Sequence, residues 1–203
     1  MKVISIQSQK GGAGKTTLTV HLASAAVARG LSVRVLDADE QKSAVLWASM
    51  RTSKTPVISY VEPAKVRAAI EKARADGVDL VIIDSPPNAG PDAVDIAAQA
   101  DLVLIPCRPG VFDVSAARRT IEIANAAHKP FLIILSSCPP RAPETAKARS
   151  AFAAAGVPVA RSEIETRRPM DRALQYGESV IEFEPDGVSA RQINALLNEV
   201  LTT

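Results

Sequence analysis

The chain has 203 residues, of which 47% are hydrophobic and 23% charged, a composition typical of a globular protein long enough to bury a full core. Lys and Arg number 24 against 22 Asp and Glu, so the net charge of +2 does not make it a nucleic-acid-binding protein by bulk charge, and any site for a polyanion must be a local patch. Aromatic residues, at 3%, are too few for a sheet of rings that stacks on single-stranded nucleic acid.

Short β-branched apolar runs alternate with alanine-rich helical stretches along the sequence. This alternation predicts an α/β fold, a doubly wound and mostly parallel sheet with helices on both faces. No linker, repeat or shift in composition divides the chain, so we expect one domain over residues 1–203. The expected strands are 2–8, 32–39, 56–61, 79–87, 101–107, 129–137 and 157–161, and the expected helices are 16–30, 43–51, 64–77, 92–100, 115–128, 144–156, 168–176 and 188–201.

The cellular setting follows from the cysteines and from the length of the apolar runs. Cys107 and Cys138 are far apart and form no C-x-x-C pair, which favours a reducing compartment over a disulfide scaffold. No run approaches the roughly 18 apolar residues of a membrane span, and no apolar signal segment precedes the first strand. We therefore expect a soluble, cytoplasmic protein.

A glycine-rich segment, QKGGAGKTTL, follows the first expected strand at residues 9–18. A strand, a glycine turn and a helix beginning near Lys15 would place backbone N–H groups and a helix dipole around an anion. Gly11, Gly12 and Gly14 would let the backbone close on phosphates, because a Cβ would obstruct or strain the turn. Lys15 would reach the β- and γ-phosphates and the Thr16 hydroxyl would bind Mg²⁺.

The loop departs from the usual pattern G-x-x-x-x-G-K-[ST], which needs a glycine where this chain has Gln9 followed by Lys10. With that lysine, KGGAGKTT resembles the deviant phosphate loop of the ParA/MinD family of ATPases at every fixed position. The resemblance implies a P-loop NTPase fold of the deviant Walker A type, with ATP and Mg²⁺ as cofactors. It also implies a nucleotide-binding set of Lys10, Gly11, Gly12, Ala13, Gly14, Lys15, Thr16 and Thr17.

By the same resemblance Lys10 is the signature lysine of the family. It reaches across an ATP-bound homodimer to the phosphates of the partner, so dimerisation and hydrolysis depend on ATP. A lysine from a second subunit adds positive charge where the transition state spreads negative charge, as an arginine finger does. The structural alternative is a solvated loop lysine.

Aspartates follow two of the expected buried strands. Asp84 ends an apolar strand, where a carboxylate is costly unless it is paired or near a metal, so it is the candidate Walker B residue that holds Mg²⁺ with Thr16. The stretch LDADEQ resembles the first switch of the family, which implies that Asp39 orients the attacking water and that Asp37 lies nearer the metal. Glu40 stands where the family usually has proline. Turn capping is the structural alternative for each aspartate.

Three further segments resemble nucleotide-proximal loops of the family. SPPNAG (85–90) would be the second switch, whose shape follows the γ-phosphate. IPCRPGVFD (105–113) resembles a proline-rich segment of short ParA proteins. In LSSCPP (135–140), Ser136 and Ser137 stand where relatives often carry Asn or Arg near the base, which weakens the transfer of adenine specificity, and Cys138 is expected to be a buried small residue.

Partner sites are expected near the C-terminal end of the chain. ParA relatives bind DNA non-specifically through basic residues of this region, which here contains Arg161, Arg167, Arg168 and Arg172. A solvated face or intramolecular ion pairs explain the same arginines. The final segment, 189–201, places Ile193, Leu196, Leu197 and Val200 on one helical face, and its uncharged polar side favours core packing over a membrane-targeting helix.

Together these features predict an ATP-dependent dimerisation switch with weak ATPase activity, of the short ParA type without an N-terminal helix-turn-helix. Its ATP dimer would bind chromosomal DNA, associate with the nucleoid, and be released by a ParB-like adaptor that stimulates hydrolysis. The cargo would be a plasmid, a chromosome locus or a protein cluster, and no membrane is involved. Two alternatives are a nucleotide-driven filament-forming protein and a metabolic P-loop enzyme.

Overall fold

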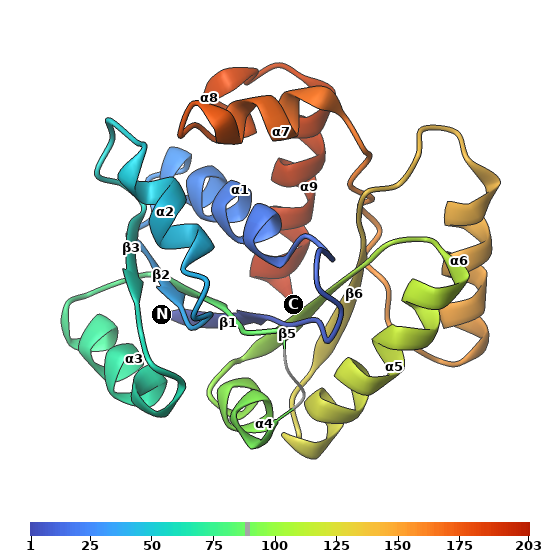
Figure 1. Cartoon of the computed structure of the whole chain (residues 1–203), viewed down its shortest axis with the longest axis horizontal. Helices are drawn as coiled ribbons and strands as arrows, with labels where there is room; N and C mark the ends of the chain where they lie inside the picture. The colour runs from blue at the N-terminus through green and yellow to red at the C-terminus, as the bar shows by residue number, and fades with distance from the viewer. Residues whose placement is uncertain (88–89) are drawn as a thin grey trace.

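A six-stranded sheet lies at the centre of the computed structural model, which describes residues 1–87 and 90–203 (Figure 1). Its strands are short runs rich in Val, Ile and Leu, whose side chains fit a pleated surface that is covered on both faces. The strand order is β3-β2-β4-β1-β5-β6, and the five pairings are parallel. The bounds are β1 Lys2–Ile6, β2 Val33–Asp37, β3 Val57–Tyr60, β4 Leu80–Asp84, β5 Leu102–Cys107 and β6 Phe131–Leu135.

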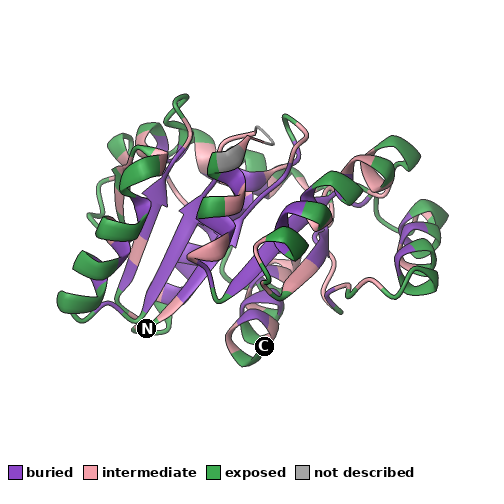
Figure 2. Cartoon of the chain, turned by 90° about the horizontal axis from the view of Figure 1, so that it is seen from below, coloured by how far each residue is buried: buried purple, intermediate pink, exposed green. Residues whose placement is uncertain are grey.

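The strands that read as continuous apolar runs are the most deeply buried part of the sheet. Every residue of β4 and β5 is buried, as are the last three residues of β6. Figure 2 shows this burial as a continuous band along the strands, with exposed residues concentrated on the outer helices. The doubly wound, parallel sheet expected from the sequence is therefore confirmed.

Helices cover both faces of the sheet (Figure 1). One face carries α1, α2 and the C-terminal helices α7 to α9, and the opposite face carries α3, α4 and α5, with α6 beside α5. The bounds are α1 Lys15–Ala28, α2 Ser43–Ser49, the 3₁₀ turn η1 Pro63–Lys65, α3 Val66–Ala75, α4 Pro91–Ala98, α5 Val111–Ala126, α6 Pro143–Ala154, α7 Arg168–Gln175, α8 Val180–Phe183 and α9 Val188–Thr202.

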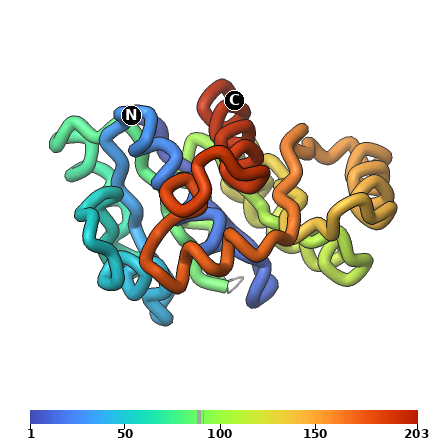
Figure 3. Tube along the Cα trace, turned by 90° about the horizontal axis from the view of Figure 1, so that it is seen from above, coloured from blue at the N-terminus to red at the C-terminus, as the bar shows by residue number. Residues whose placement is uncertain are grey.

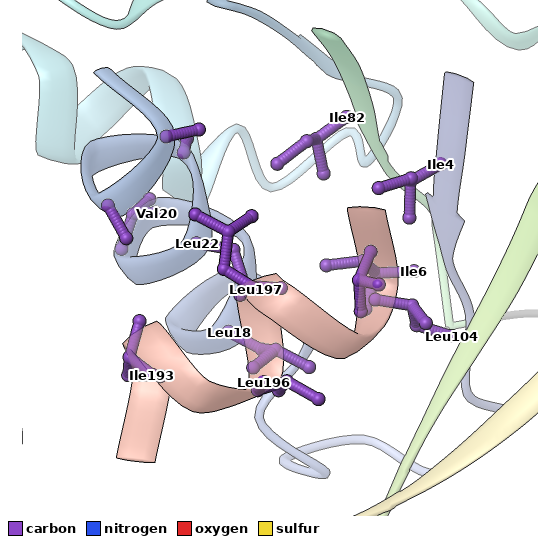
Figure 4. Packing of buried hydrophobic residues seen from close by; sticks show 14 of the residues in the cluster. Ile4, Ile6, Leu18, Val20, Leu22, Ile82, Leu104, Ile193, Leu196 and Leu197 are labelled. Atoms are coloured by element: carbon purple, nitrogen blue, oxygen red, sulfur yellow. The ribbon is translucent and has the colours of Figure 1, made fainter. Parts of the chain in front are cut away.

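The C-terminal helix packs on α1. Seen from above, the red C-terminal segment lies over the blue segment that contains α1 (Figure 3). Figure 4 shows Ile193, Leu196 and Leu197 of α9 beside Leu18 and Leu22 of α1. These α9 side chains are fully buried, and burying each one contributes about 1.5–3 kcal/mol to stability. The expected core packing of this helix is confirmed.

In the part of the chain that the structure describes, no helix is both long enough and apolar enough to cross a bilayer.

One expected strand is wrong, and one short helix was not predicted. The segment 157–161 forms only one bridge, Ile133 to Val159, because after Ala160 the chain leaves the strand direction, and the N–H groups of Arg161 and Ser162 both donate to the Glu199 carboxylate. The four-residue helix α8 was not expected, since it is too short to show a helical period. It begins at a capping box formed by Ser179 and Glu182.

The connections define a crevice at the carboxyl ends of the strands. β1 lies between β4 and β5, and the helix after β1 crosses one face of the sheet while the helices after β4 and β5 lie on the other (Figure 1). The loops that follow these strands therefore separate around β1. In open α/β sheets, ligands bind at such a point.

Candidate functional site

The glycine-rich loop after β1 has the backbone conformation that its glycines were expected to permit. Gly12 and Gly14 have φ angles of 70° and 90°, a left-handed region in which a side chain is strained. Gly14 is the N-cap of α1, so the free N–H groups of the first helical turn face the loop. At Gly11 an added Cβ would meet no heavy atom of the protein within 4 Å, so the need for glycine at this position stays a prediction about bound phosphates.

Thr16 and Asp84 meet at the entrance to α1. The Thr16 hydroxyl donates a 2.6 Å hydrogen bond to Oδ2 of Asp84, the last residue of β4. Asp84 is 1% exposed, and its burial raises the pKa of the carboxyl to about 7 despite this hydrogen bond. Its Oδ1 is buried without a hydrogen-bond partner among the described residues. A hydroxyl beside an unsatisfied carboxylate oxygen is a donor set that fits Mg²⁺.

Lys15 begins α1 and lies inside the loop. Its side chain is largely enclosed, and burial lowers the pKa of its ammonium group, an effect partly opposed by the negative charges of Asp84 and Asp39. The residue is thus a buried cation at the centre of an anion-binding loop.

Asp37, the last residue of β2, caps α2 from a distance. Its Oδ1 accepts a hydrogen bond from the N–H of Asp39, and its Oδ2 accepts from Ala44 and Val45 in the first turn of α2. Burial raises the pKa of this carboxyl, and the backbone hydrogen bonds lower it. The turn-capping alternative describes Asp37 in this structure.

Asp39 lies in the following loop, half-buried, and its Oδ1 accepts a hydrogen bond from the N–H of Gln41. Its loop faces Pro86 and Pro87 across a cavity of about 280 Å³. The two candidate switch segments therefore border one space. Residues 88 and 89 of the second segment lie outside the described residues.

A larger cavity of about 520 Å³ opens beside the glycine loop, within the usual size range of small-molecule sites. One side is formed by the loop and the start of α1. The other side comes from the segments after β5 and β6 and from the approach to α7. The lining residues are Gly12, Gly14, Thr17, Leu18, Arg108, Ser136, Ser137, Ile164, Glu165, Thr166, Arg167, Met170 and Asp171.

The cavity places Ser136 and Ser137 next to the loop, in agreement with the expected position of LSSCPP. It also includes Arg108, which sequence reasoning did not single out. The Arg108 guanidinium donates a 2.6 Å hydrogen bond to the carbonyl oxygen of Gly12, which ties the turn after β5 to the glycine loop. Its position within the proline-rich segment 105–113 was the available signal.

Lys10 is directed toward α5. Its ammonium group forms an ion pair of 2.7 Å with Oδ1 of Asp113 in the first turn of that helix. The Lys10 side chain is 41% exposed and that of Asp113 is 14% exposed. The two lysines of the loop thus differ, since Lys15 is buried at the centre and Lys10 is accessible at the rim.

The four arginines near α7 are not equivalent. Arg167 borders the large cavity and pairs with Glu165 at 2.5 Å, so the ion-pair alternative describes this residue. Arg161, Arg168 and Arg172 are exposed. Of the four arginines, only these three are exposed to solvent.

Both cysteines are buried and free, as expected for Cys138. Burial raises the pKa of the Cys107 thiol to about 12 and that of the Cys138 thiol to about 11, which makes both unreactive at neutral pH.

The fold and loop geometry agree with comparisons to known proteins. Residues 4–203 match the model of the CobQ/CobB/MinD/ParA nucleotide-binding domain, so the chain belongs to this family. This confirms the relationship expected from the phosphate loop.

Individual relatives cover nearly the whole chain. The chain is 29% identical to maintenance of carboxysome distribution protein A of Halothiobacillus neapolitanus, over 98% of this chain and 95% of the relative. Among solved structures, a complex of Cyanothece McdA with ATP has a TM-score of 0.75 at 22% identity, covering 100% of this chain and 96% of the other. MinD of Aquifex aeolicus has a TM-score of 0.79 at 19% identity, covering 100% and 98%. The two structures show that the fold is shared.

Proposed function

We propose that this protein is an ATP-dependent dimerisation switch with weak ATPase activity that positions a cargo in the cell. Full-length similarity to a carboxysome distribution protein supports a positioning role, with a protein assembly, a plasmid or a chromosome locus as the cargo. The family membership and the cavity beside the glycine loop support the nucleotide.

In this proposal each residue of the site has a distinct task. ATP occupies the 520 Å³ cavity with its phosphates on the backbone N–H groups of the loop, and Lys15 contacts the β- and γ-oxygens. Thr16 and Asp84 hold Mg²⁺, which when bound neutralises charge on the phosphates. Asp39 orients the attacking water, and Asp37 holds the loop of Asp39 in place through its hydrogen bonds.

The observation that carries the proposal is the contrast between the two lysines. Lys15 is buried in the loop of its own chain, whereas the Lys10 side chain is 41% exposed at the rim and pairs with Asp113. A lysine at the rim can reach the phosphates of a second copy that faces the same loop. Charge from that copy would act where the transition state is negative.

The ATP-bound dimer is proposed to bind DNA non-specifically and to be released by a ParB-like adaptor that stimulates hydrolysis. The exposed arginines are Arg161, Arg168 and Arg172. A two-fold axis would present each of them twice on the dimer and so double the positive charge available to DNA phosphates. The charge of each phosphate contact, rather than a base sequence, would supply the affinity.

Sedimentation of the purified protein with ATP, with ADP and without nucleotide tests the proposal. The wild type is expected to dimerise with ATP only. Lys10→Ala is expected to keep bound nucleotide but remain monomeric, because its own pocket is intact. Lys147→Ala, an exposed lysine on α6, is the matched control and should dimerise like the wild type. An ATP-dependent dimer of Lys10→Ala equal to that of the wild type would contradict the proposal.

A further inference from the structure

We propose that Asp113 is a positioning residue for Lys10, which holds the Lys10 ammonium group on its own chain until the triphosphate of a second copy comes within reach. The inference rests on the proposed function and adds a regulatory contact to it. Asp113 would then set the concentration at which the ATP dimer forms.

The carboxylate of Asp113 is held by the start of α5. The Asp113 N–H donates to the carbonyl oxygen of Gly110, the N-cap of the helix, at 3.0 Å. Its Oδ2 lies 3.1 Å from the place where a Cβ on Gly110 would be, so the side chain folds back over the turn. At 14% exposure, Asp113 is the enclosed partner of the ion pair, and Lys10 is the partner that can leave.

The backbone next to Lys10 is also attached to α5. The N–H of Gln9 donates a 3.3 Å hydrogen bond to the hydroxyl of Thr120 on this helix. The N–H of Lys10 donates to the hydroxyl of Ser8 at 3.3 Å, which keeps the segment in a tight turn. The turn and the ion pair together direct the Lys10 side chain along its own chain rather than outward.

The Lys10–Asp113 ion pair would respond to the nucleotide because the Lys10 ammonium group can exchange Asp113 for a phosphate bound by the second copy. A triphosphate with several negative charges attracts an ammonium group more strongly than one carboxylate does, and a diphosphate offers no γ-phosphate. An ion pair with an exposed partner contributes up to about 1 kcal/mol, which is about fivefold in an equilibrium constant. A symmetric dimer loses two such pairs, so the contact would weaken dimerisation by up to about 25-fold.

The dissociation constant of the ATP dimer, measured by sedimentation, tests this inference. Asp113→Asn is expected to tighten the dimer by up to about 25-fold, whereas Asp113→Glu should remain close to the wild type because it keeps the charge. Glu144→Gln removes an acid from the first turn of α6 and is the matched control, with no expected change. In a Lys10→Ala background, which is expected to be monomeric, Asp113→Asn should not restore an ATP dimer. An unchanged or weaker dimer of Asp113→Asn overturns the inference.

A second measurement does not require a dimer. In nucleotide-free protein, an amine-reactive ester should modify Lys10 faster in Asp113→Asn than in the wild type, as quantified by mass spectrometry, with Lys147 as the internal reference. Equal rates would show that the ion pair does not hold Lys10, and would overturn the inference. Failure of the proposed function has a different signature, a Lys10→Ala protein that dimerises like the wild type. Thermal unfolding of each variant identifies any that does not fold, and Asp113→Ala, which also removes the charge, then replaces Asp113→Asn in the labelling experiment.

Discussion

Asp37 and Asp84 end two neighbouring parallel strands and lie directly opposite each other in the sheet register. Both side chains are almost fully buried, and burial raises the pKa of each. Three backbone N–H groups donate to Asp37, but Asp84 has one hydroxyl donor and an Oδ1 without a partner among the described residues. Asp84 therefore has a buried carboxylate oxygen that no hydrogen-bond donor among the described residues satisfies.

We predict that Asp84→Asn stabilises the ligand-free protein while weakening its binding of Mg²⁺ and nucleotide. The pKa of Asp84 is raised in the folded state, so the penalty of its charge grows as pH rises from about 4 and is complete above about 7. Removing the charge should raise the free energy of unfolding at pH 8 by roughly 2 to 4 kcal/mol. Urea unfolding without nucleotide measures this, and Asp79→Asn, outside the site, is the control. Lower stability of Asp84→Asn at pH 8 would contradict the prediction.

Asp39→Ala is expected to trap the ATP dimer. The residue borders the cavity between the two candidate switch loops and is only half-buried, so its removal should spare the fold and the phosphate loop while slowing attack by water at least about tenfold. Sedimentation with ATP, together with release of phosphate, measures both effects. Glu40→Ala, the exposed neighbour, is the control, and a monomeric Asp39→Ala protein would contradict the expectation.

DNA binding should depend on the exposed arginines of α7. Replacing Arg168 and Arg172 together by Ala removes four charges per dimer, so the slope of log K against log salt should fall in magnitude by roughly 3 to 4. Co-sedimentation with DNA in the presence of ATP measures this slope. The matched control is replacement of Arg67 and Arg74 on α3, across the sheet. An equal slope in both variants would exclude Arg168 and Arg172 as the DNA-binding site. Pelleting of the protein with ATP but without DNA would favour the filament-forming alternative.

Stability should fall below pH 6.5 because of His21. This side chain is fully buried in α1, its Nδ1 accepts a hydrogen bond from the N–H of Val180, and burial lowers its pKa to about 4. The neutral form is therefore required in the folded state, and the unfolded chain gains a proton as pH falls from 6.5 toward 4.

The predicted loss between pH 7 and pH 5 is about 2 kcal/mol in the free energy of unfolding. His21→Gln, whose side-chain oxygen can accept the same hydrogen bond, should lose less over this range by about that amount. Urea unfolding of the wild type and of His21→Gln at pH 7 and pH 5 measures this difference. The carboxylates contribute equally to the pH dependence of both proteins, so their contribution cancels. Parallel pH profiles would show that His21 is not responsible.

Local patterns were enough to predict the sheet and the phosphate loop. β4 and β5 read as continuous apolar runs because both faces of these strands are covered, and GKT follows a strand and starts a helix because the loop must expose its N–H groups. The segment 157–161 has the same apolar pattern but fails as a strand. Glu199, on α9, accepts hydrogen bonds from the N–H groups of Arg161 and Ser162, so the regular pairing with β6 stops after Ala160.

The sequence by itself determined the fold family and the residues of the loop from Lys10 to Thr17, because both depend on spacing along the chain. Only the tertiary structure decided which side chains meet that loop. Arg108 and Asp113 follow β5 and Asp84 ends β4, and they reach the loop after β1 because parallel strands bring their carboxyl ends to one edge of the sheet. The direction of Lys10 toward its own α5 also depends on that packing, since no local pattern specifies which carboxylate lies within reach.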